Sequence, residues 1–358
     1  MSTRASLSDG DRVDVRGIRV AVVGAGAWGG NHVRAFGRLG PGVLAAVCDP
    51  EPKHLAAAAA AVPGIRCTSG LKDLLENGDG VEAVVVSTPS STHFEVALAA
   101  LMAGKHVLVE KPLALIAAQA ERLVREAASR HLVLMTGHLL LYHPAVRRMK
   151  ELVDSGELGS VYYLYSQRVN LGQVRRDENA LWSLAPHDIA VTLYLLGEEP
   201  VDVSARGGSY LQDGIPDVVF LNMRFAGDRM AQVQLSWLDP HKIRRTTVVG
   251  SRKMVVFDDM DSLEKLRIYD KGVDRNPGAV PYSDSLTLRW GDVLIPRIKM
   301  EEPLVVECRH FLQCIRDGAL PLSDGRQGLA VVRILEAAQA SMERGGEPVA
   351  LVAAGEAR

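Results

Sequence analysis

A short apolar run that ends in a glycine-rich turn constrains the fold of this chain more than any other feature of its sequence. The run Ile18–Val23 is typical of a buried strand, and the glycines after it are Gly24, Gly26 and Gly29, which fit the pattern GxGxxG. A helical pattern, Gly29–Leu39, begins at the third glycine. In such a turn the first glycine permits a tight bend, the second lets a pyrophosphate approach backbone N–H groups, and the third allows close packing of helix on strand. The turn therefore predicts a dinucleotide-binding site.

A carboxylate after the next strand supports this interpretation. Asp49 follows the predicted strand Val43–Cys48, at the position where an acidic side chain binds the adenosine ribose hydroxyls. The same charge repels a 2′-phosphate, which favours NAD over NADP as the cofactor. Lys53 could offset that repulsion, so NADP stays the less favoured alternative.

The order of predicted elements changes along the chain. In the first part, apolar strands alternate with helical patterns, which is typical of a parallel sheet with crossover helices. After about residue 155 the strands follow one another through short turns, such as Ala226–Asp228, which predicts an open, mostly antiparallel sheet. The segment Asp274–Pro281 is predicted to be a surface loop. The strands predicted in this part are Val161–Val169, Val201–Ser209, Asp217–Phe225, Met230–Trp237 and Arg244–Val249.

The length of 358 residues suits two domains of the α/β class. Residues 1–16 are predicted to be a loose extension, residues 17–145 the dinucleotide-binding domain, and residues 146–358 a substrate-binding α/β domain. Two helices, Leu304–Asp317 and Gly325–Arg344, close the chain. Whether these helices pack back on the first domain is left open.

Composition and charge exclude several classes of function. The sum of 41 Lys and Arg against 43 Asp and Glu gives a net charge of −2, so nothing attracts the whole chain to nucleic acid or to an anionic membrane. No apolar stretch approaches the roughly 20 residues that a spanning helix needs. The four cysteines have no CxxC or metal-finger spacing, which predicts no metal site and reduced thiols in a cytoplasmic protein.

A charged pair ends another predicted strand. Glu110-Lys111-Pro112 follows the apolar strand His106–Val109, and in an open parallel sheet that edge is where ligands bind. A lysine held there can donate a hydrogen bond to a substrate oxygen. Spacing alone leaves a surface Glu–Lys pair equally open.

The motifs taken together resemble the Gfo/Idh/MocA family, the relatives of glucose–fructose oxidoreductase and inositol dehydrogenase. The resemblance covers nearly the whole chain from residue 17. It implies a Rossmann domain with a parallel sheet, then an α/β domain with an open, largely antiparallel sheet, and NAD(P)-dependent oxidation or reduction at a sugar or polyol carbon. The segments that carry it are Gly24–Gly29, Ser87–Ser90 with His93, Glu110–Pro112, Gly137-His138, Pro144–Gly159, Pro186–Asp188 and Glu307–Ser341.

The resemblance also implies roles for individual residues. Lys111 would be the catalytic lysine that hydrogen-bonds the reacting hydroxyl, and His187 the candidate general base. The loop Ser87–His93 would run beneath the nicotinamide ribose, and Glu110 would orient that end of the cofactor. The predicted cofactor-binding residues are Gly24, Gly26, Ala27, Trp28, Gly29, Asp49, Ser87, Thr88, Pro89, His93 and Glu110; the predicted substrate-binding residues are Lys111, His138, Tyr142, Arg168, Asn170, Ser183 and His187.

The segment around His187 departs from the family pattern. A helix is expected over Leu184–Leu196, with Pro186 in its first turn. Many family members carry an aspartate four residues before the histidine, where this chain has Ser183. Leu141 also stands where relatives often have arginine. These changes suggest a different substrate head group.

The segment from Arg168 to His187 bears on the substrate. Its run from Asn170 to Asp188 resembles a bacterial subgroup of sugar-nucleotide dehydrogenases that oxidise C3 of UDP-linked N-acetylhexosamine uronates, and Arg168 and Asn170 are the predicted contacts. The expected function is therefore hydride transfer between NAD and a ring carbon of a nucleotide-linked sugar. Alternatives are an inositol or free-sugar dehydrogenase and, more distantly, a non-catalytic NAD-binding sensor. Relatives commonly pair through the exposed face of the second sheet, so a homo-oligomer, dimer or tetramer, is expected.

Overall fold

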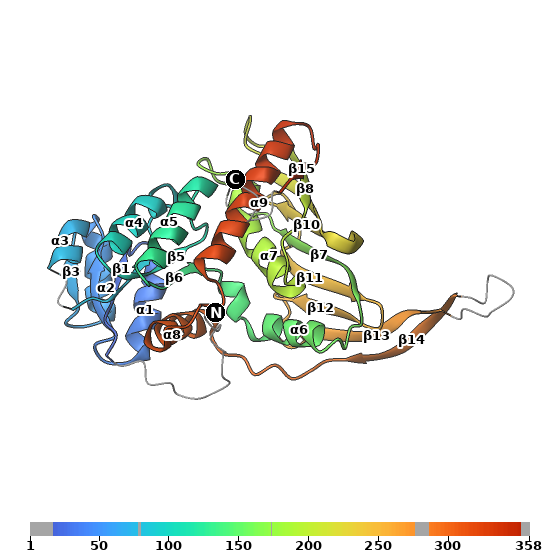
Figure 1. Ribbon diagram of the computed structural model, residues 1–358, viewed down its shortest axis with the longest axis horizontal. Helices are drawn as coiled ribbons and strands as arrows, with labels where there is room; N and C mark the ends of the chain where they lie inside the picture. Colours follow the sequence, from blue (N-terminus) through green and yellow to red (C-terminus); the bar gives the residue numbers. More distant parts are fainter. Residues whose placement is uncertain (1–16, 78–79, 173, 276–285, 352–358) are drawn as a thin grey trace. The chain divides into compact units, whose positions relative to one another are not determined.

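The computed structural model describes residues 17–77, 80–172, 174–275 and 286–351. These residues fold into two compact units (Figure 1). The first unit holds the chain up to Tyr142 together with Glu301–Arg333, and the second holds His143–Met300 together with the chain from Ile334 onward. The predicted extension, residues 1–16, lies outside the described residues.

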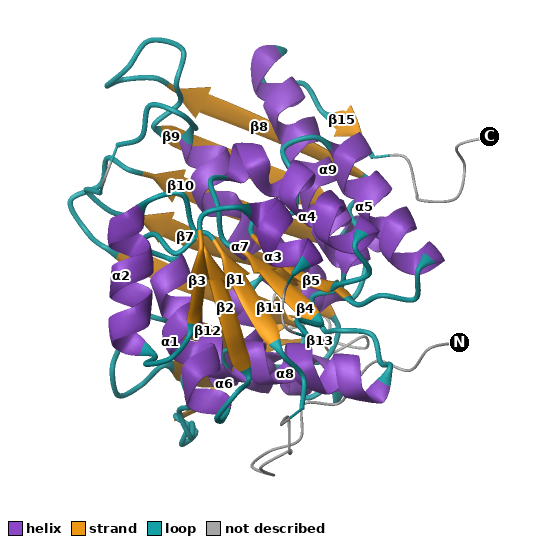
Figure 2. Cartoon of the chain, turned by 90° about the vertical axis from the view of Figure 1, so that its left-hand side faces the viewer, coloured by secondary structure: helices purple, strands orange, loops and turns teal. Residues whose placement is uncertain are grey.

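The first unit is built on a parallel sheet. Among its described residues the strand order is β3-β2-β1-β4-β5-β6, which Figure 2 shows in part as a fan of neighbouring strands. Because the order reverses at β1 and β4, the carboxyl ends of these two strands border the crevice where such sheets bind ligands. The expected Rossmann topology is confirmed. Its strands are β1 Val20–Val23, β2 Leu44–Cys48, β3 Arg66–Thr68, β4 Ala83–Val86, β5 His106–Glu110 and β6 Leu134–Gly137.

Helices cover both faces of this sheet. Helices α1 and α2 contact each other and α8 contacts α1, whereas α4 contacts α5, and Figure 1 shows the two groups on opposite sides of the strands. Every residue of β1 and β4 is buried, as expected for central parallel strands covered on both faces. The helical segments are α1 Gly29–Leu39, α2 Pro52–Ala61, α3 Leu71–Glu76, η1 Ser90–Thr92, α4 His93–Met102, α5 Ala117–Ser129, η2 Leu139–Tyr142 and α8 Pro303–Asp317.

The second unit contains a mixed sheet that is mostly antiparallel. Its order over the described residues is β14-β13-β12-β11-β7-β10-β9-β8-β15, and β7 and β10 form its parallel pair. The expected open, mostly antiparallel sheet is confirmed. The strands are β7 Val161–Val169, β8 Asp202–Gly208, β9 Val218–Arg224, β10 Met230–Ser236, β11 Ile243–Gly250, β12 Met254–Asp258, β13 Leu266–Arg275, β14 Leu286–Leu294 and β15 Val349–Ala350.

One face of the second sheet packs on helices. Helix α7 (Ala180–Leu196) contacts β7, β9 and β10, and α6 (Pro144–Asp154) contacts β12. Helix α9 (Gly325–Glu343) begins in the first unit and ends in the second. Figure 1 shows the sheet continuing into the long β13–β14 ribbon.

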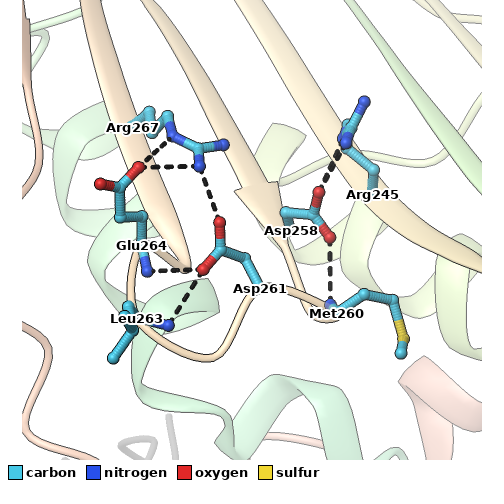
Figure 3. A network of polar contacts seen from close by, with 7 residues as sticks. All are labelled: Arg245, Asp258, Met260, Asp261, Leu263, Glu264 and Arg267. Carbon is cyan, nitrogen blue, oxygen red and sulfur yellow. Dashed lines mark hydrogen bonds and ion pairs between the residues drawn. The ribbon is translucent and has the colours of Figure 1, made fainter.

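Turns at the ends of the strands follow local polar chemistry. The short segment η3 (Ala226–Asp228) joins antiparallel β9 and β10, which confirms the predicted hairpin turn. Between β12 and β13, Asp261 accepts hydrogen bonds from the N–H groups of Leu263 (3.0 Å) and Glu264 (2.8 Å), and Arg267 bridges Asp261 and Glu264 (Figure 3). These contacts fix the conformation of the turn between β12 and β13.

One prediction about the second unit is wrong, and another is contradicted over its first two residues. Helix α7 begins at Ala180, because the side chain of Asn179 caps it by accepting a hydrogen bond from the Trp182 N–H (3.1 Å); Pro186 therefore lies inside the helix and not in its first turn. The segment expected as a loop from Asp274 starts within β13, which runs to Arg275, and the rest of that segment lies outside the described residues.

Candidate functional site

The glycine-rich turn of the first unit brings two backbone segments into close contact. Gly24 has φ of 86°, and a Cβ atom there would lie 2.6 Å from the Ser87 carbonyl oxygen; a Cβ on Gly29 would lie 1.9 Å from the Gly24 carbonyl oxygen. Both positions therefore require glycine. Around Gly26 the surroundings are open, and the nearest atom to a Cβ built there is His54 Cε1 at 3.7 Å. This leaves room beside Gly26 and the N-terminus of α1 for a pyrophosphate.

Asp49 lies at the end of β2 and is 4% exposed. Its Oδ2 accepts a hydrogen bond from the Ala25 N–H (2.6 Å), within the glycine-rich turn, and its Oδ1 contacts the Glu51 N–H (2.9 Å) and His54 Nδ1 (3.0 Å). Burial favours protonation, but these three donors together hold the pKa of Asp49 below its usual value. An ionised carboxylate is therefore fixed beside the turn.

The loop after β4 is tied to the loop after β5. The ring of His93, 1% exposed, contacts the carbonyl oxygens of Thr88 (2.9 Å) and Pro112 (2.8 Å). Burial lowers the pKa of His93, so the ring stays neutral and donates to one of these carbonyls at a time. The predicted cofactor residues Thr88 and His93 are thus joined to the Glu110–Pro112 motif.

Glu110 is the point where α1 meets the end of β5. One carboxylate oxygen accepts hydrogen bonds from the Trp28 indole and from His32 Nε2 (2.7 Å), and the other accepts from the Lys111 backbone N–H (3.2 Å). Burial opposes ionisation, but the His32 and Trp28 contacts and the Lys111 charge together outweigh it and keep the pKa of Glu110 below its usual value. Lys111 is partly exposed and precedes a cis peptide bond to Pro112.

The structure adds residues that no sequence pattern marked. His32 follows Trp28 by one helical turn, and its Nδ1 lies 3.8 Å from Cys308 Sγ on α8. Glu307, next to that cysteine, is fully buried, and neither carboxyl oxygen has a hydrogen-bond partner in the described chain. Burial and the nearby Glu110 charge raise the pKa of Glu307 well above its usual value. The spacing of four between Trp28 and His32 could have placed His32 on the same helix face as Trp28. No sequence pattern could have indicated Glu307.

Two predicted substrate contacts of the first unit are deeply buried. His138 is 1% exposed and burial lowers its pKa to about 3, so its ring is neutral; in the resolved geometry of the described residues neither ring nitrogen has a partner. Tyr142 is fully buried, and its hydroxyl lies 3.0 Å from Ser323 Oγ. Their contact with a substrate stays a prediction.

In the second unit, α7 carries the predicted general base. Ser183 and His187 are one turn apart on this helix; Ser183 is buried and His187 is partly exposed. Arg168, on β7, forms a buried ion pair with Asp188 (2.5 Å), and its contact with a substrate stays a prediction. Asn170 follows β7, and its backbone N–H donates to the Ser236 carbonyl (3.1 Å).

Lys111 and His187 belong to different units, so their convergence on one substrate stays a prediction. Across the described residues, no group of three or more His, Cys, Asp or Glu side chains could hold a metal ion. None of the helices found there is long and apolar enough to cross a membrane.

Two family models match the chain. One, described as an oxidoreductase family with an NAD-binding Rossmann fold, matches residues 18–138, and the other, described as the GFO/IDH/MocA C-terminal domain, matches residues 146–256.

Curated relatives and solved structures match over most of the chain. The UDP-N-acetylglucosamine 3-dehydrogenase of Acidithiobacillus ferrooxidans is 29% identical over 91% of this chain and 99% of its own length, and its solved structure has a TM-score of 0.76 over 91% of this chain and 98% of that one. GenD2 from gentamicin A biosynthesis, solved in complex with NAD, is 27% identical with a TM-score of 0.78, covering 94% and 97% of the two chains. Inositol 2-dehydrogenase 2 of Saccharopolyspora erythraea is 34% identical, over 53% of this chain and 57% of its own.

Proposed function

This chain belongs to the Gfo/Idh/MocA family of oxidoreductases, and we propose that it moves a hydride between NAD and ring carbon C3 of a nucleotide-linked sugar, forming or reducing a 3-keto sugar. The observation that carries this proposal is the likeness, over nearly the full length of both chains, to a UDP-N-acetylglucosamine 3-dehydrogenase. The reaction class, a sugar dehydrogenase acting on CH–OH, follows from the family.

The residues of the first unit fit a bound dinucleotide. The open space beside Gly26 fits a pyrophosphate, and the ionised Asp49 fits the adenosine ribose. When bound, the nicotinamide supplies the acceptor or donor of the hydride. The repulsion between Asp49 and a 2′-phosphate supports NAD as the cofactor.

Proton transfer is assigned to the chain's own side chains. His187 accepts the proton of the reacting hydroxyl, and the Lys111 ammonium donates a hydrogen bond to the oxygen that remains. Glu110, held by Trp28 and His32, keeps the segment that carries Lys111 in place. Arg168, Asn170 and Ser183 are the further proposed substrate contacts, and the ion pair with Asp188 orients the Arg168 side chain.

Turnover of a substrate panel tests this function. We expect NAD reduction, followed by the absorbance of NADH, with UDP-N-acetylglucosamine or its uronate, and a loss of about 10²–10⁴-fold in kcat/KM for Lys111→Ala. Lys72→Ala, which removes a side chain that is 85% exposed on α3, is the matched control. Binding of a polyol while every uridine or thymidine nucleotide sugar fails to bind would overturn the nucleotide-sugar assignment.

A second candidate substrate class is inositol or a free sugar. It is favoured by the identity of 34% to an inositol 2-dehydrogenase, although the match spans little more than half of either chain. The same panel, with myo-inositol and glucose included, separates the two substrate classes.

We also propose that two copies pair through the open face of the second sheet. The registers of β7, β10 and β9 put Tyr163, Tyr165, Met230 and Phe220 on one face, and all four side chains are exposed. A groove of about 650 Å³ lies on the same face.

The four cysteines form no disulfide, which supports a reducing compartment, the cytoplasm.

A further inference from the structure

A histidine in the first turn of α2 reaches the candidate ribose site. His54 Nδ1 lies 3.0 Å from Asp49 Oδ1, and His54 Cε1 is the atom nearest to a Cβ built on Gly26. The ring therefore extends from the carboxylate to the glycine-rich turn. The His54 side chain is 32% exposed, whereas that of Asp49 is 6% exposed, so the ring is the more accessible of the two groups.

The hydrogen bonds of Asp49 leave it little free capacity. An ionised carboxylate offers about four acceptor positions. In this structure three of them are used, by the N–H groups of Ala25 and Glu51 and by the His54 ring. Asp49 can therefore accept about one more hydrogen bond, whereas the adenosine ribose of NAD presents two hydroxyls.

The contact with Asp49 also determines the chemistry of the other ring nitrogen. Because an ionised carboxylate only accepts, Nδ1 of His54 carries a proton. In the neutral ring Nε2 is then a hydrogen-bond acceptor. In this tautomer Nε2 can accept a hydrogen bond from a ribose hydroxyl and has no hydrogen to donate to a 2′-phosphate.

We propose that His54, together with Asp49, binds the adenosine ribose and sets the preference for NAD over NADP. The inference rests on the proposed function only in so far as the chain binds a nicotinamide dinucleotide. His54 acts in two ways: it accepts one ribose hydroxyl, and it holds the Asp49 carboxylate in the orientation that accepts the other.

Dissociation constants of NAD and NADP, measured by calorimetry on the full chain without any sugar, test this proposal. We expect His54→Ala to weaken NAD binding about tenfold, the value of one good hydrogen bond, with little change for NADP, so that selectivity falls about tenfold. His54→Gln keeps an amide that can donate to Asp49 and accept from the ribose, and should stay within about threefold of the wild type.

Lys72→Ala is the matched control, because it removes a cation whose side chain is 85% exposed on α3 and should leave selectivity unchanged. Unchanged NAD binding and selectivity in a folded His54→Ala variant, with the melting temperature of the wild type, would overturn the proposal, as would an equal loss of selectivity in Lys72→Ala. If the wild type binds NAD but turns over no nucleotide sugar, only the substrate assignment fails, and the comparison of dissociation constants still decides the role of His54.

Discussion

Two buried glutamates of the first unit experience opposite electrostatic surroundings. Glu110 is stabilised as a carboxylate by His32 and Trp28, so its pKa is lowered, whereas Glu307 has no hydrogen-bond partner within the described chain and its pKa is raised. One buried negative charge is thus favoured at Glu110 and a neutral acid at Glu307. The charge sits beside Lys111, where the proposed chemistry needs a fixed geometry.

These opposite shifts predict opposite effects of removing each charge. A carboxyl with a lowered folded-state pKa stabilises the protein above its unfolded pKa, and that stability disappears as the pH falls through the folded value; a carboxyl with a raised pKa destabilises it as the pH rises above the unfolded pKa. At pH 8 we expect Glu307→Gln to raise the free energy of unfolding by about 1–3 kcal/mol and Glu110→Gln to lower it by a similar amount. Urea denaturation at pH 8 and pH 5 measures both, and the gain from Glu307→Gln should shrink at pH 5. A Glu307→Gln variant less stable than the wild type at pH 8 would contradict the raised pKa of Glu307.

Sequence patterns identified the residues that belong to a motif, but they did not identify the residues that these contact in the folded chain. Gly24 and Gly29 were predicted because the turn chemistry is local, and Asp49 because a carboxylate follows the next strand. His32 and Glu110 are 78 residues apart, and Cys308 is 276 residues from His32, so only the folded chain brings them together. The contact of His54 with Asp49 spans five residues, but a lone histidine in a helix has no pattern that identifies its partner.

At the scale of elements, the cap of α7 determines where the helix with His187 begins. The predicted start at Leu184 was four residues late, because proline usually occupies the first turn of a helix and the prediction placed Pro186 there. The Asn179 side chain caps the helix earlier in the chain, and that cap determines the start. The elements β3 and α3 were missed because they are short, with three and six residues, and a segment of that length shows no clear hydrophobic periodicity. The other strands of the first sheet, four or five residues each, were predicted to within about two residues.

The cap itself is open to measurement. Asn179→Ala removes the oxygen that accepts from the Trp182 N–H, and we expect a loss of about 1 kcal/mol in the free energy of unfolding, measured by urea denaturation. Asn179 Nδ2 also donates to Gln339 Oε1 (2.9 Å). Gln339→Ala removes that second contact and the exposed hydrogen bond from Gln339 Nε2 to Glu343 (2.9 Å) but leaves the cap in place, and it should cost less than about 0.5 kcal/mol. Equal losses in the two variants would mean that the Gln339 contact, and not the cap, stabilises the helix.

At the scale of the whole molecule, the open face of the second sheet predicts an oligomer. A stable interface needs about 800 Å² from each partner, and a face with several exposed aromatic and methionine side chains suits such burial. We expect the wild type to be a dimer or larger by light scattering and the double variant Phe220→Glu and Met230→Glu to be a monomer. Leu263→Glu, at a 90% exposed side chain in the β12–β13 turn, is the control and should leave the assembly intact. A wild type that is monomeric at micromolar concentration would contradict the proposed pairing.

The division of the chain also has a consequence for biosynthesis. The polypeptide passes from one unit to the other after Tyr142, after Met300 and after Arg333, and α8, synthesised late, supplies the Cys308 contact to His32 in the first unit. A ribosome that has released only the first 300 residues has therefore made every strand of the nucleotide-binding sheet without one of its covering helices. Completion of the first unit therefore has to wait until residues 143–300 of the second have been synthesised, and a nonsense codon between Glu301 and Arg333 would damage the unit whose strands were translated first.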